Sequence, residues 1–280
     1  MARVAVVTDS TNGLPAEVIE KYDVRVVPLQ VVLGGRLGAD GVDVMPADVA
    51  AALRAHVSVS TSRPAPSAFA RAYEQAADDG HDAVVSVHLS AGLSGTVEAA
   101  RLAAADSPAP VQVVDSASTA MGLGFPVLAA AEAAAAGASA DEVAGAATRA
   151  VSRTRALFYV HSLDALRRGG RLGQAASLVG SALAVKPLLH VVHGRIAVCE
   201  KVRTATKALL RLEELAIDGL GEMPVDAAVH HLAAAERAAQ LAASLRTALP
   251  GLAALHVSEV GAVLGAHVGV GLLGVVVHRR

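Results

Sequence analysis

The chain has 280 residues, 53% hydrophobic and 18% charged, which predicts an extensive buried core in one large domain or two of ordinary size. The formal net charge is −2, and aromatic residues make up 2% with no tryptophan, which excludes a basic or stacking surface for nucleic acid. The single cysteine, Cys199, excludes an internal disulfide and a cysteine-based zinc site, as is typical of a reducing cytoplasm.

The two most apolar parts of the chain match neither a signal peptide nor a membrane span. The first residues, MARVAVVTDS, lack the long apolar run and small-residue cleavage pattern of a signal peptide. Residues 261–277 are too few and too rich in glycine to cross a bilayer. We therefore expect a cytoplasmic protein without stable membrane insertion, in which residues 261–277 are buried beside a ligand.

The first half of the chain alternates β-rich and alanine-rich segments. Strands are predicted at residues 3–10, 24–33, 82–90 and 111–118. Helices are predicted at residues 15–22, 45–55, 67–80, 96–105 and 123–136. This alternation predicts a doubly wound, mostly parallel sheet with helices on both faces.

The second half interrupts this alternation with a predicted β-hairpin at residues 186–203, which turns at His193-Gly194. The other predicted segments are a strand at 156–163, a helix end, glycine break and new helix within 166–183, a helix at 204–218, a strand at 225–232, a helix at 234–248 and a strand at 254–260. A hairpin among α/β units predicts a mixed sheet. We therefore expect a two-lobe α/β protein, with an N-terminal lobe at 1–150 and a C-terminal lobe at 151–280.

Three predicted strands of the first half end in hydroxyl and carboxylate side chains. These ends are Asp9-Ser10-Thr11, Ser90 and Asp115-Ser116. Ligands of doubly wound sheets bind outside the carboxyl ends of the strands. The simpler interpretation is that each polar residue caps the helix that follows it. Three such ends on one sheet edge favour a binding site there.

The segment LSAGLSGT, residues 89–96, is the most informative loop between a strand and a helix. Its spacing, Gly92-Leu93-Ser94-Gly95, places the second glycine one residue too early for the nucleophile elbow of an α/β-hydrolase. The chain also lacks a phosphate-binding P-loop and a glycine-rich dinucleotide fingerprint. A serine hydrolase that uses Ser94 remains an alternative, because a triad is defined by geometry.

A pocket of hydroxyl and amide groups for a small anion is the interpretation favoured for this loop. Ser94, Thr96 and the first amides of the next helix can converge on one point, where the helix dipole favours negative charge. A second hydroxyl cluster, Ser60-Thr61-Ser62, precedes two prolines. Hydroxyls and amides with few basic residues suit a carboxylate better than a phosphate, although both loops could simply be helix caps.

Basic residues gather in the second half, at Arg167, Arg168, Arg171, Lys186, Lys201, Arg203 and Lys207. They predict either a solvated face or a docking surface for an acidic partner. The glycines of the Gly169-Gly170-Arg171 turn would fix the direction of its arginine. No metal site is expected, since the adjacent His230 and His231 point to opposite faces of a strand.

Taken together, these motifs resemble those of the DegV family of fatty-acid-binding proteins, the binding subunits of bacterial fatty acid kinase. The resemblance is carried by VAVVTDST (4–11), VVPLQV (26–31), DGVDVMPADV (40–49), STSRPAPS (60–67), VHLSAGLSGT (87–96), VVDSASTAMGLG (113–124), LRRGGRLG (166–173), residues 186–204 and SEVGAVLGAHVGVGLLG (258–274). Their number and order extend the resemblance over nearly the whole chain.

The resemblance implies a buried acyl chain whose carboxylate is held by Thr61 and Ser94. His267 is implied as a third polar neighbour, with Ser62 and Thr96 beside the two hydroxyls. The family member does not catalyse and needs neither cofactor nor metal. Its implied ligand is a long-chain, palmitate-like fatty acid.

The resemblance also implies a partner protein. A separate, ATP-using fatty acid kinase subunit would receive the carboxylate and form an acyl phosphate, and Arg171 and Arg203 match family arginines expected to meet it. A lipid carrier or sensor without a kinase partner remains an alternative.

The sequence departs from the family pattern at several positions. Arg63 replaces a glutamine, and either adds charge near the carboxylate or faces solvent. His267-Val268-Gly269-Val270-Gly271 replaces His-Thr-Gly-Pro-Gly, Val59 stands where a proline is common, and His161-Ser162 replaces an acidic pair.

Overall fold

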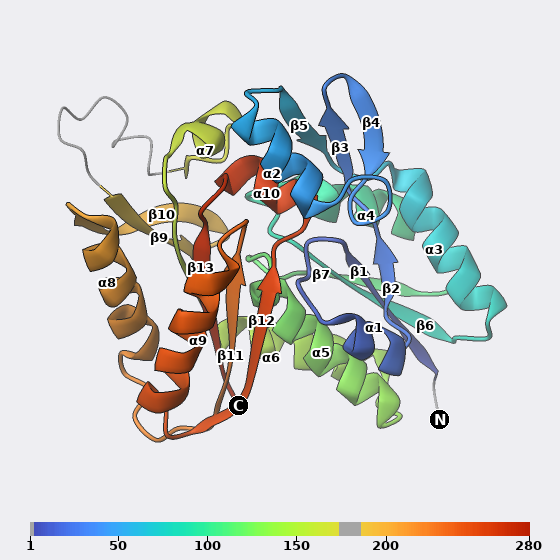
Figure 1. The fold of residues 1–280 in the computed structure, drawn as a ribbon. Helices are drawn as coiled ribbons and strands as arrows, with labels where there is room; N and C mark the ends of the chain where they lie inside the picture. Colours follow the sequence, from blue (N-terminus) through green and yellow to red (C-terminus); the bar gives the residue numbers. More distant parts are fainter. Residues whose placement is uncertain (1–2, 174–185) are drawn as a thin grey trace. The chain divides into compact units, whose positions relative to one another are not determined.

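The computed structural model describes residues 3–173 and 186–280 (Figure 1). Its contacts divide the chain into two compact units, Met1–Gln30 with Ser62–Ser152 and Val31–Thr61 with Arg153–Arg280. This grouping differs from the predicted lobes, 1–150 and 151–280, in residues 31–61, which the contacts assign to the second unit. Most of the new helix predicted within residues 166–183 lies outside the described residues.

The first unit contains a parallel sheet of four strands in the order β2-β1-β6-β7. The strands are β1 (Val4–Asp9), β2 (Arg25–Val27), β6 (Ala83–His88) and β7 (Val111–Asp115). Every residue of β1 and β6 is buried, as expected for central strands that are covered on both faces. The doubly wound parallel sheet predicted for this part of the chain is confirmed.

Helices cover both faces of this sheet (Figure 1). The helices of the first unit are α1 (Ala16–Lys21), α3 (Pro66–Asp78), α4 (Thr96–Ala104), α5 (Met121–Ala135) and α6 (Ala140–Ser152). Helices α3 and α4 pack together over Ala5, Val7 and Val84, which share one face because alternate strand residues point the same way. Helices α5 and α6 pack together on the opposite face; α6 has no counterpart among the predicted elements.

A chain of hydrogen bonds crosses the buried core of the first unit. Asp9 Oδ2 lies 3.1 Å from His88 Nδ1, and His88 Nε2 lies 2.7 Å from Ser86 Oγ. Ser86 Oγ lies 2.9 Å from the Tyr73 hydroxyl. All four side chains are 0% exposed, so each depends on the others for its hydrogen bonds. Burial raises the pKa of Tyr73 to about 12, which keeps its hydroxyl protonated.

The main sheet of the second unit is mixed, with the strand order β10-β9-β8-β13-β11-β12. Its strands are β8 (Thr154–Tyr159), β9 (Lys186–Val192), β10 (Arg195–Val202), β11 (Val225–His231), β12 (Leu252–Glu259) and β13 (Leu273–Arg279). Only the β11–β12 pair is parallel among these described neighbours. The predicted hairpin is confirmed, because β9 and β10 pair through a turn in which His193 and Gly194 have φ of 49° and 72°.

Two layers complete the second unit. Helices α8 (Ala205–Ile217) and α9 (Ala235–Ala248) pack on the main sheet over a core that includes Tyr159, Leu188, Leu212, Leu245 and Leu273. The remaining elements are the three-stranded sheet β4-β3-β5, formed by β3 (Gln30–Leu33), β4 (Arg36–Ala39) and β5 (Val59–Ser62), and the helices α2 (Pro46–Arg54), α7 (Asp164–Arg168) and α10 (Ala262–Val268). Helix α10 packs against both α2 and α7, two helices that lie far apart in the sequence.

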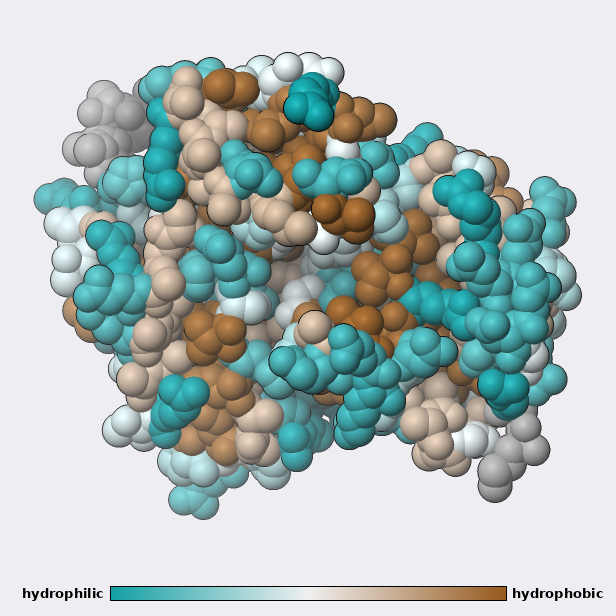
Figure 2. Space-filling model, turned by 45° about the vertical axis from the view of Figure 1, so that its right-hand side comes forward, coloured by the Kyte–Doolittle hydropathy of each residue, from teal (hydrophilic) through white to brown (hydrophobic). Residues whose placement is uncertain are grey.

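The surface of residues 31–61 carries exposed apolar side chains. Leu37 and Val42 are 68% and 67% exposed, and Met45 and Val57 are also exposed. Figure 2 shows hydrophobic surface in its upper part. Because the view is turned about the vertical axis only, this is the level at which residues 31–61 lie in Figure 1. No helix within residues 3–173 and 186–280 is long and apolar enough to cross a membrane.

The buried hydrogen-bond chain predicts a measurable loss of stability for Ser86→Ala. The substitution removes the hydrogen-bond partner of His88 Nε2 and one partner of the Tyr73 hydroxyl in a site without water access. We expect the free energy of unfolding, measured by urea denaturation, to fall by about 1–3 kcal/mol. Ser107→Ala is the matched control, since the buried Ser107 hydroxyl bonds to no described residue. Equal stability of the two variants would contradict the prediction.

Candidate functional site

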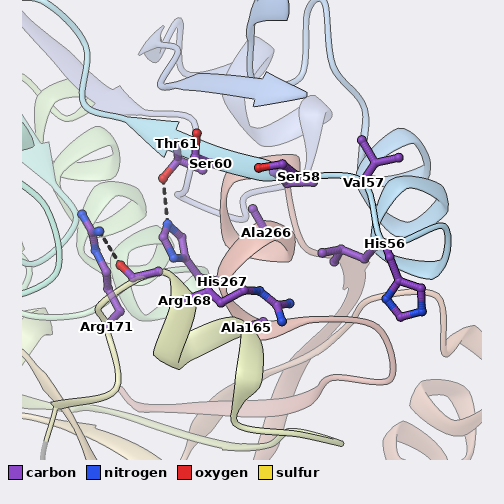
Figure 3. Close-up of a pocket in the computed structure, with 13 residues that line it drawn as sticks. His56, Val57, Ser58, Ser60, Thr61, Ala165, Arg168, Arg171, Ala266 and His267 are labelled. Atoms are coloured by element: carbon purple, nitrogen blue, oxygen red, sulfur yellow. Dashed lines mark hydrogen bonds between the residues drawn. The ribbon is translucent and has the colours of Figure 1, made fainter. Parts of the chain in front are cut away.

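A hydrogen bond joins two side chains of the second unit that the sequence separates by 206 positions. Thr61 Oγ1, on β5, lies 2.7 Å from His267 Nε2, on α10 (Figure 3). Both side chains are half-buried. The structure therefore brings together two of the residues that the family resemblance implies as ligand contacts.

Asp40 holds the helix that carries His267. Its carboxylate oxygen Oδ1 accepts hydrogen bonds from the backbone N–H groups of Ala262 at 2.8 Å and Val263 at 3.3 Å. Asp40 is 3% exposed, and its charge lies at the positive end of the α10 dipole. In the sequence, Asp40 belongs only to the family motif at residues 40–49, and nothing local to Asp40 points to a helix that begins 222 residues later.

A cavity of about 420 Å³ lies beside the Thr61–His267 pair, within the second unit (Figure 3). Hydroxyl and basic side chains form its polar lining, from Ser58, Ser60, Thr61, His56, Arg168, Arg171 and His267. Its other lining residues are Leu53, Val57, Val59, Ala165, Gly169 and Ala266. None of these described lining residues is acidic, so the cavity has the chemistry of an anion site with apolar walls.

His267 is neutral in this environment. Burial, and then the nearby charge of Arg171, lower the pKa of His267 from 6.5 to about 4. Its other ring nitrogen, Nδ1, is buried and has no hydrogen-bond partner among the described residues. Arg171 is itself half-buried and donates from Nη1 to the carbonyl oxygen of Gly169 at 2.6 Å.

Ser94 and Thr96, the other pair of hydroxyl residues predicted to bind the anion, lie in the first unit. Ser94 Oγ and Thr96 Oγ1 are 2.8 Å apart at the start of α4, where Thr96 is fully buried and Ser94 half-buried. Ser62, also in this unit, is exposed at the end of β5. Because Thr61 and Ser94 belong to different units, the idea that they hold one carboxylate stays a prediction.

Arg63 lies against the turn that contains Ser94. A Cβ atom added to Gly95 would lie 2.9 Å from Arg63 Cδ and 3.2 Å from Cζ, so the arginine side chain covers that glycine. Arg63 is also exposed to solvent, so the position fits both interpretations and its role near a carboxylate stays a prediction.

The carboxylates at the strand ends of the first unit hold loops rather than cap helices. Asp9 Oδ2 accepts a hydrogen bond from Leu89 N–H at 2.9 Å, and Asp115 Oδ1 accepts one from Ala117 N–H at 2.8 Å. Helices α1, α4 and α5 begin without a side-chain cap. The capping interpretation is therefore wrong for these ends, which fix the loops of one sheet edge.

Within the described residues of the first unit, no histidine bonds to the hydroxyl of Ser94. The ring nitrogens of His88 face Asp9 and Ser86 within the core, and the hydroxyl of Ser94 faces Thr96. No group of three metal-binding side chains exists among residues 3–173 and 186–280.

The two arginines predicted to meet a partner differ in exposure. Arg203 is exposed just after β10, whereas Arg171 lines the cavity. Their role in binding a partner stays a prediction.

The buried histidines of the second unit predict a loss of stability in acid. Burial lowers the pKa of both His267 and His230 from 6.5 to about 4. The unfolded chain therefore binds more protons below pH 6.5, and the free energy of unfolding falls as pH decreases toward 4, by about 3 kcal/mol per histidine. Urea denaturation at pH 7, 5.5 and 4.5 should show a shallower pH dependence for His267→Gln than for the unsubstituted protein.

The exposed His193, at the hairpin turn, provides the control for this measurement. Asparagine tolerates its positive φ of 49°, so His193→Asn should keep the pH dependence of the unsubstituted protein. Parallel curves for His267→Gln and the unsubstituted protein would contradict the assignment of a neutral, buried His267.

Comparison with known proteins assigns the chain to a family. The model of the DegV family, described as uncharacterised proteins, matches residues 3–280. A DegV domain-containing protein of Streptomyces coelicolor is 57% identical over 277 residues, which cover 99% of each chain. The structures of a fatty-acid-binding DegV family protein from Thermus thermophilus and of DegV, a fatty acid binding protein from Bacillus subtilis, each superpose with a TM-score of 0.92 at 33% identity. These alignments cover 99% and 100% of this chain and 100% of each structure, and the chain belongs to the DegV family.

Proposed function

We propose that this protein binds a long-chain fatty acid and that the Thr61–His267 pair contacts its carboxylate. The observation that carries the proposal is the 2.7 Å hydrogen bond between these side chains at the wall of a 420 Å³ cavity. The Thermus thermophilus and Bacillus subtilis relatives are described as fatty acid binding, which supports the same class of ligand here.

The cavity suits a carboxylate by its hydrogen-bond donors and its charge. A buried carboxylate needs hydrogen bonds to replace those of water, and bonds to an ionised group are stronger than neutral ones. Hydroxyl side chains from β5 and the neighbouring segment supply donors, while Arg168 and Arg171 supply positive charge. His267 is neutral near pH 7, so it acts through its hydrogen bond.

The acyl chain would supply most of the affinity. Each buried methylene contributes roughly 0.8 kcal/mol, so a long chain outweighs a few polar contacts to its head group. Leu53, Val57 and Val59 give the cavity an aliphatic wall where the chain can begin. The polar contacts then determine orientation and the preference for an acid over an ester or alcohol.

Further contacts to the carboxylate are proposed for residues of the first unit. Ser94 and Thr96 offer hydroxyl donors at the start of α4, and Ser62 of the same unit offers another hydroxyl. The side chain of Arg63 adds positive charge to the same turn.

We propose further that the bound carboxylate is presented to a separate, ATP-using kinase subunit in the cytoplasm. A carboxylate oxygen would attack the γ-phosphorus of ATP, the bond to the ADP oxygen would break, and an acyl phosphate and ADP would form. The protein itself would orient the nucleophile without catalysing, and Arg171 and Arg203 would face the partner.

Lipid analysis of the purified protein tests the proposed ligand. Mass spectrometry of solvent extracts, from protein purified without added lipid, should detect long-chain fatty acid near one equivalent. Thr61→Val keeps the shape of the side chain and removes its hydroxyl, so palmitate should bind about 5- to 100-fold more weakly. Thr119→Val is the control, because the Thr119 hydroxyl bonds to no described residue. Absence of fatty acid in the extracts, with no binding of added palmitate, would reject the function.

Substitution of Arg203 tests the proposed partner. With a purified fatty acid kinase catalytic subunit and ATP, Arg203→Ala should lower the rate of acyl phosphate formation at least about tenfold, as expected for a lost interface charge pair. Palmitate affinity should not change. Arg195→Ala, an exposed arginine at the start of the same strand, should retain the full rate. A normal rate for Arg203→Ala would favour a carrier or sensor that uses no kinase at this surface.

A further inference from the structure

Two adjacent glycines follow α7, and they differ in why the fold needs glycine. Gly170 has a φ of +69°, and an added Cβ atom there would meet no atom within 4 Å. Gly169 has an ordinary helical φ of −74°. Its backbone conformation therefore accepts any residue, and the need for glycine must come from its surroundings.

The surroundings of Gly169 are the ring of His267. A Cβ atom at position 169 would lie 2.8 Å from His267 Cε1, closer still to Nδ1, and 3.3 Å from the carbonyl oxygen of Ala165. Real Cβ atoms essentially never approach another atom closer than 3.0 Å. Any side chain at position 169 would consequently displace the imidazole from its place beside Thr61.

The ring nitrogen that faces Gly169, Nδ1, helps to determine which nitrogen of His267 carries the proton. A proton on Nδ1 would be a buried donor without an acceptor among the described residues, which is unfavourable. A proton on Nε2 instead has Thr61 Oγ1 as its acceptor, at 2.7 Å. Buried unpaired N–H groups are rarer in proteins than under-used acceptors, so the Nε2–H form is favoured.

This proton position decides what Thr61 offers to a ligand. Once Thr61 Oγ1 accepts from Nε2–H, its own hydroxyl proton is turned away from the histidine, toward the cavity. The opposite tautomer would draw the hydroxyl proton onto Nε2 and present only oxygen lone pairs, which repel a carboxylate.

We propose that Gly169 is a positioning residue, which packs against His267 so that the Nε2–H tautomer makes Thr61 a hydrogen-bond donor to an anionic head group. Arg171 supports this arrangement, because it donates to the carbonyl oxygen of Gly169 and fixes the turn. The inference rests on the proposed function only for the identity of the anion as a fatty-acid carboxylate.

The first experiment uses the unsubstituted protein without ligand. Long-range ¹H–¹⁵N NMR spectra of ¹⁵N-histidine-labelled protein at pH 7 should show His267 protonated at Nε2 and unprotonated at Nδ1, with His267→Gln used to assign its signals. A His267 that carries its proton on Nδ1 would overturn the proposal, whatever ligand the protein binds.

The second experiment measures palmitate affinity in a double-mutant cycle. Gly169→Ala should weaken binding about 10- to 100-fold, matching His267→Ala, and should lower the preference for palmitate over palmityl alcohol. Added to His267→Ala, the same substitution should change affinity less than about twofold, because no ring remains to be displaced.

A matched variant of the neighbouring glycine completes the design. Gly170→Asn, which tolerates the positive φ, should retain the affinity of the unsubstituted protein. An equal loss from Gly169→Ala with and without His267, or none in either background, would overturn the proposal. If the unsubstituted protein binds no palmitate, the proposed function fails, while spectra of Gly169→Ala still decide the role of Gly169, since a displaced ring should shift the His267 signals.

Discussion

The hydrogen bond between Thr61 and the half-buried, neutral His267 is the interaction on which the candidate site of the second unit depends. It fixes β5 to α10, and α10 in turn packs on α2 and α7. Burial keeps the histidine uncharged near pH 7 by lowering its pKa to about 4. A charged imidazole in the same place would need a carboxylate partner, and the cavity beside it has no acidic side chain among its described lining residues.

Three residues keep this histidine in place, and each lies far from it in the sequence. Asp40 binds the first amides of α10, so the helix begins at a fixed point. Gly169 leaves room for the ring, and Arg171 holds the turn that contains Gly169. In the proposed anion site, these contacts would hold the polar groups in place before a ligand arrives, which would lower the entropic cost of binding.

In the first unit, a carboxylate fixes the loop that carries the predicted site residue Ser94. There a carboxylate at the end of β1, Asp9, binds the side chain of His88 and the amide of Leu89, and thereby sets the start of the loop that leads to Ser94. One carboxylate can reach both groups because neighbouring strands of a parallel sheet end at the same edge. Polar residues that resemble helix caps in the sequence are in fact the ties between these loops.

The sequence by itself determined the alternation of strands and helices and the hairpin at residues 186–203. Hydrophobic period, glycine and proline positions, and short polar motifs are local signals, and they lie within a few residues of the features they predict. The same signals did not separate β2 from β3 at Pro28, did not identify α6, and did not associate residues 31–61 with the second unit. Only tertiary structure decided that Thr61 meets His267, that Asp40 begins α10 and that Gly169 faces an imidazole, because these contacts join residues about 100 to more than 200 positions apart, at distances that no local pattern encodes.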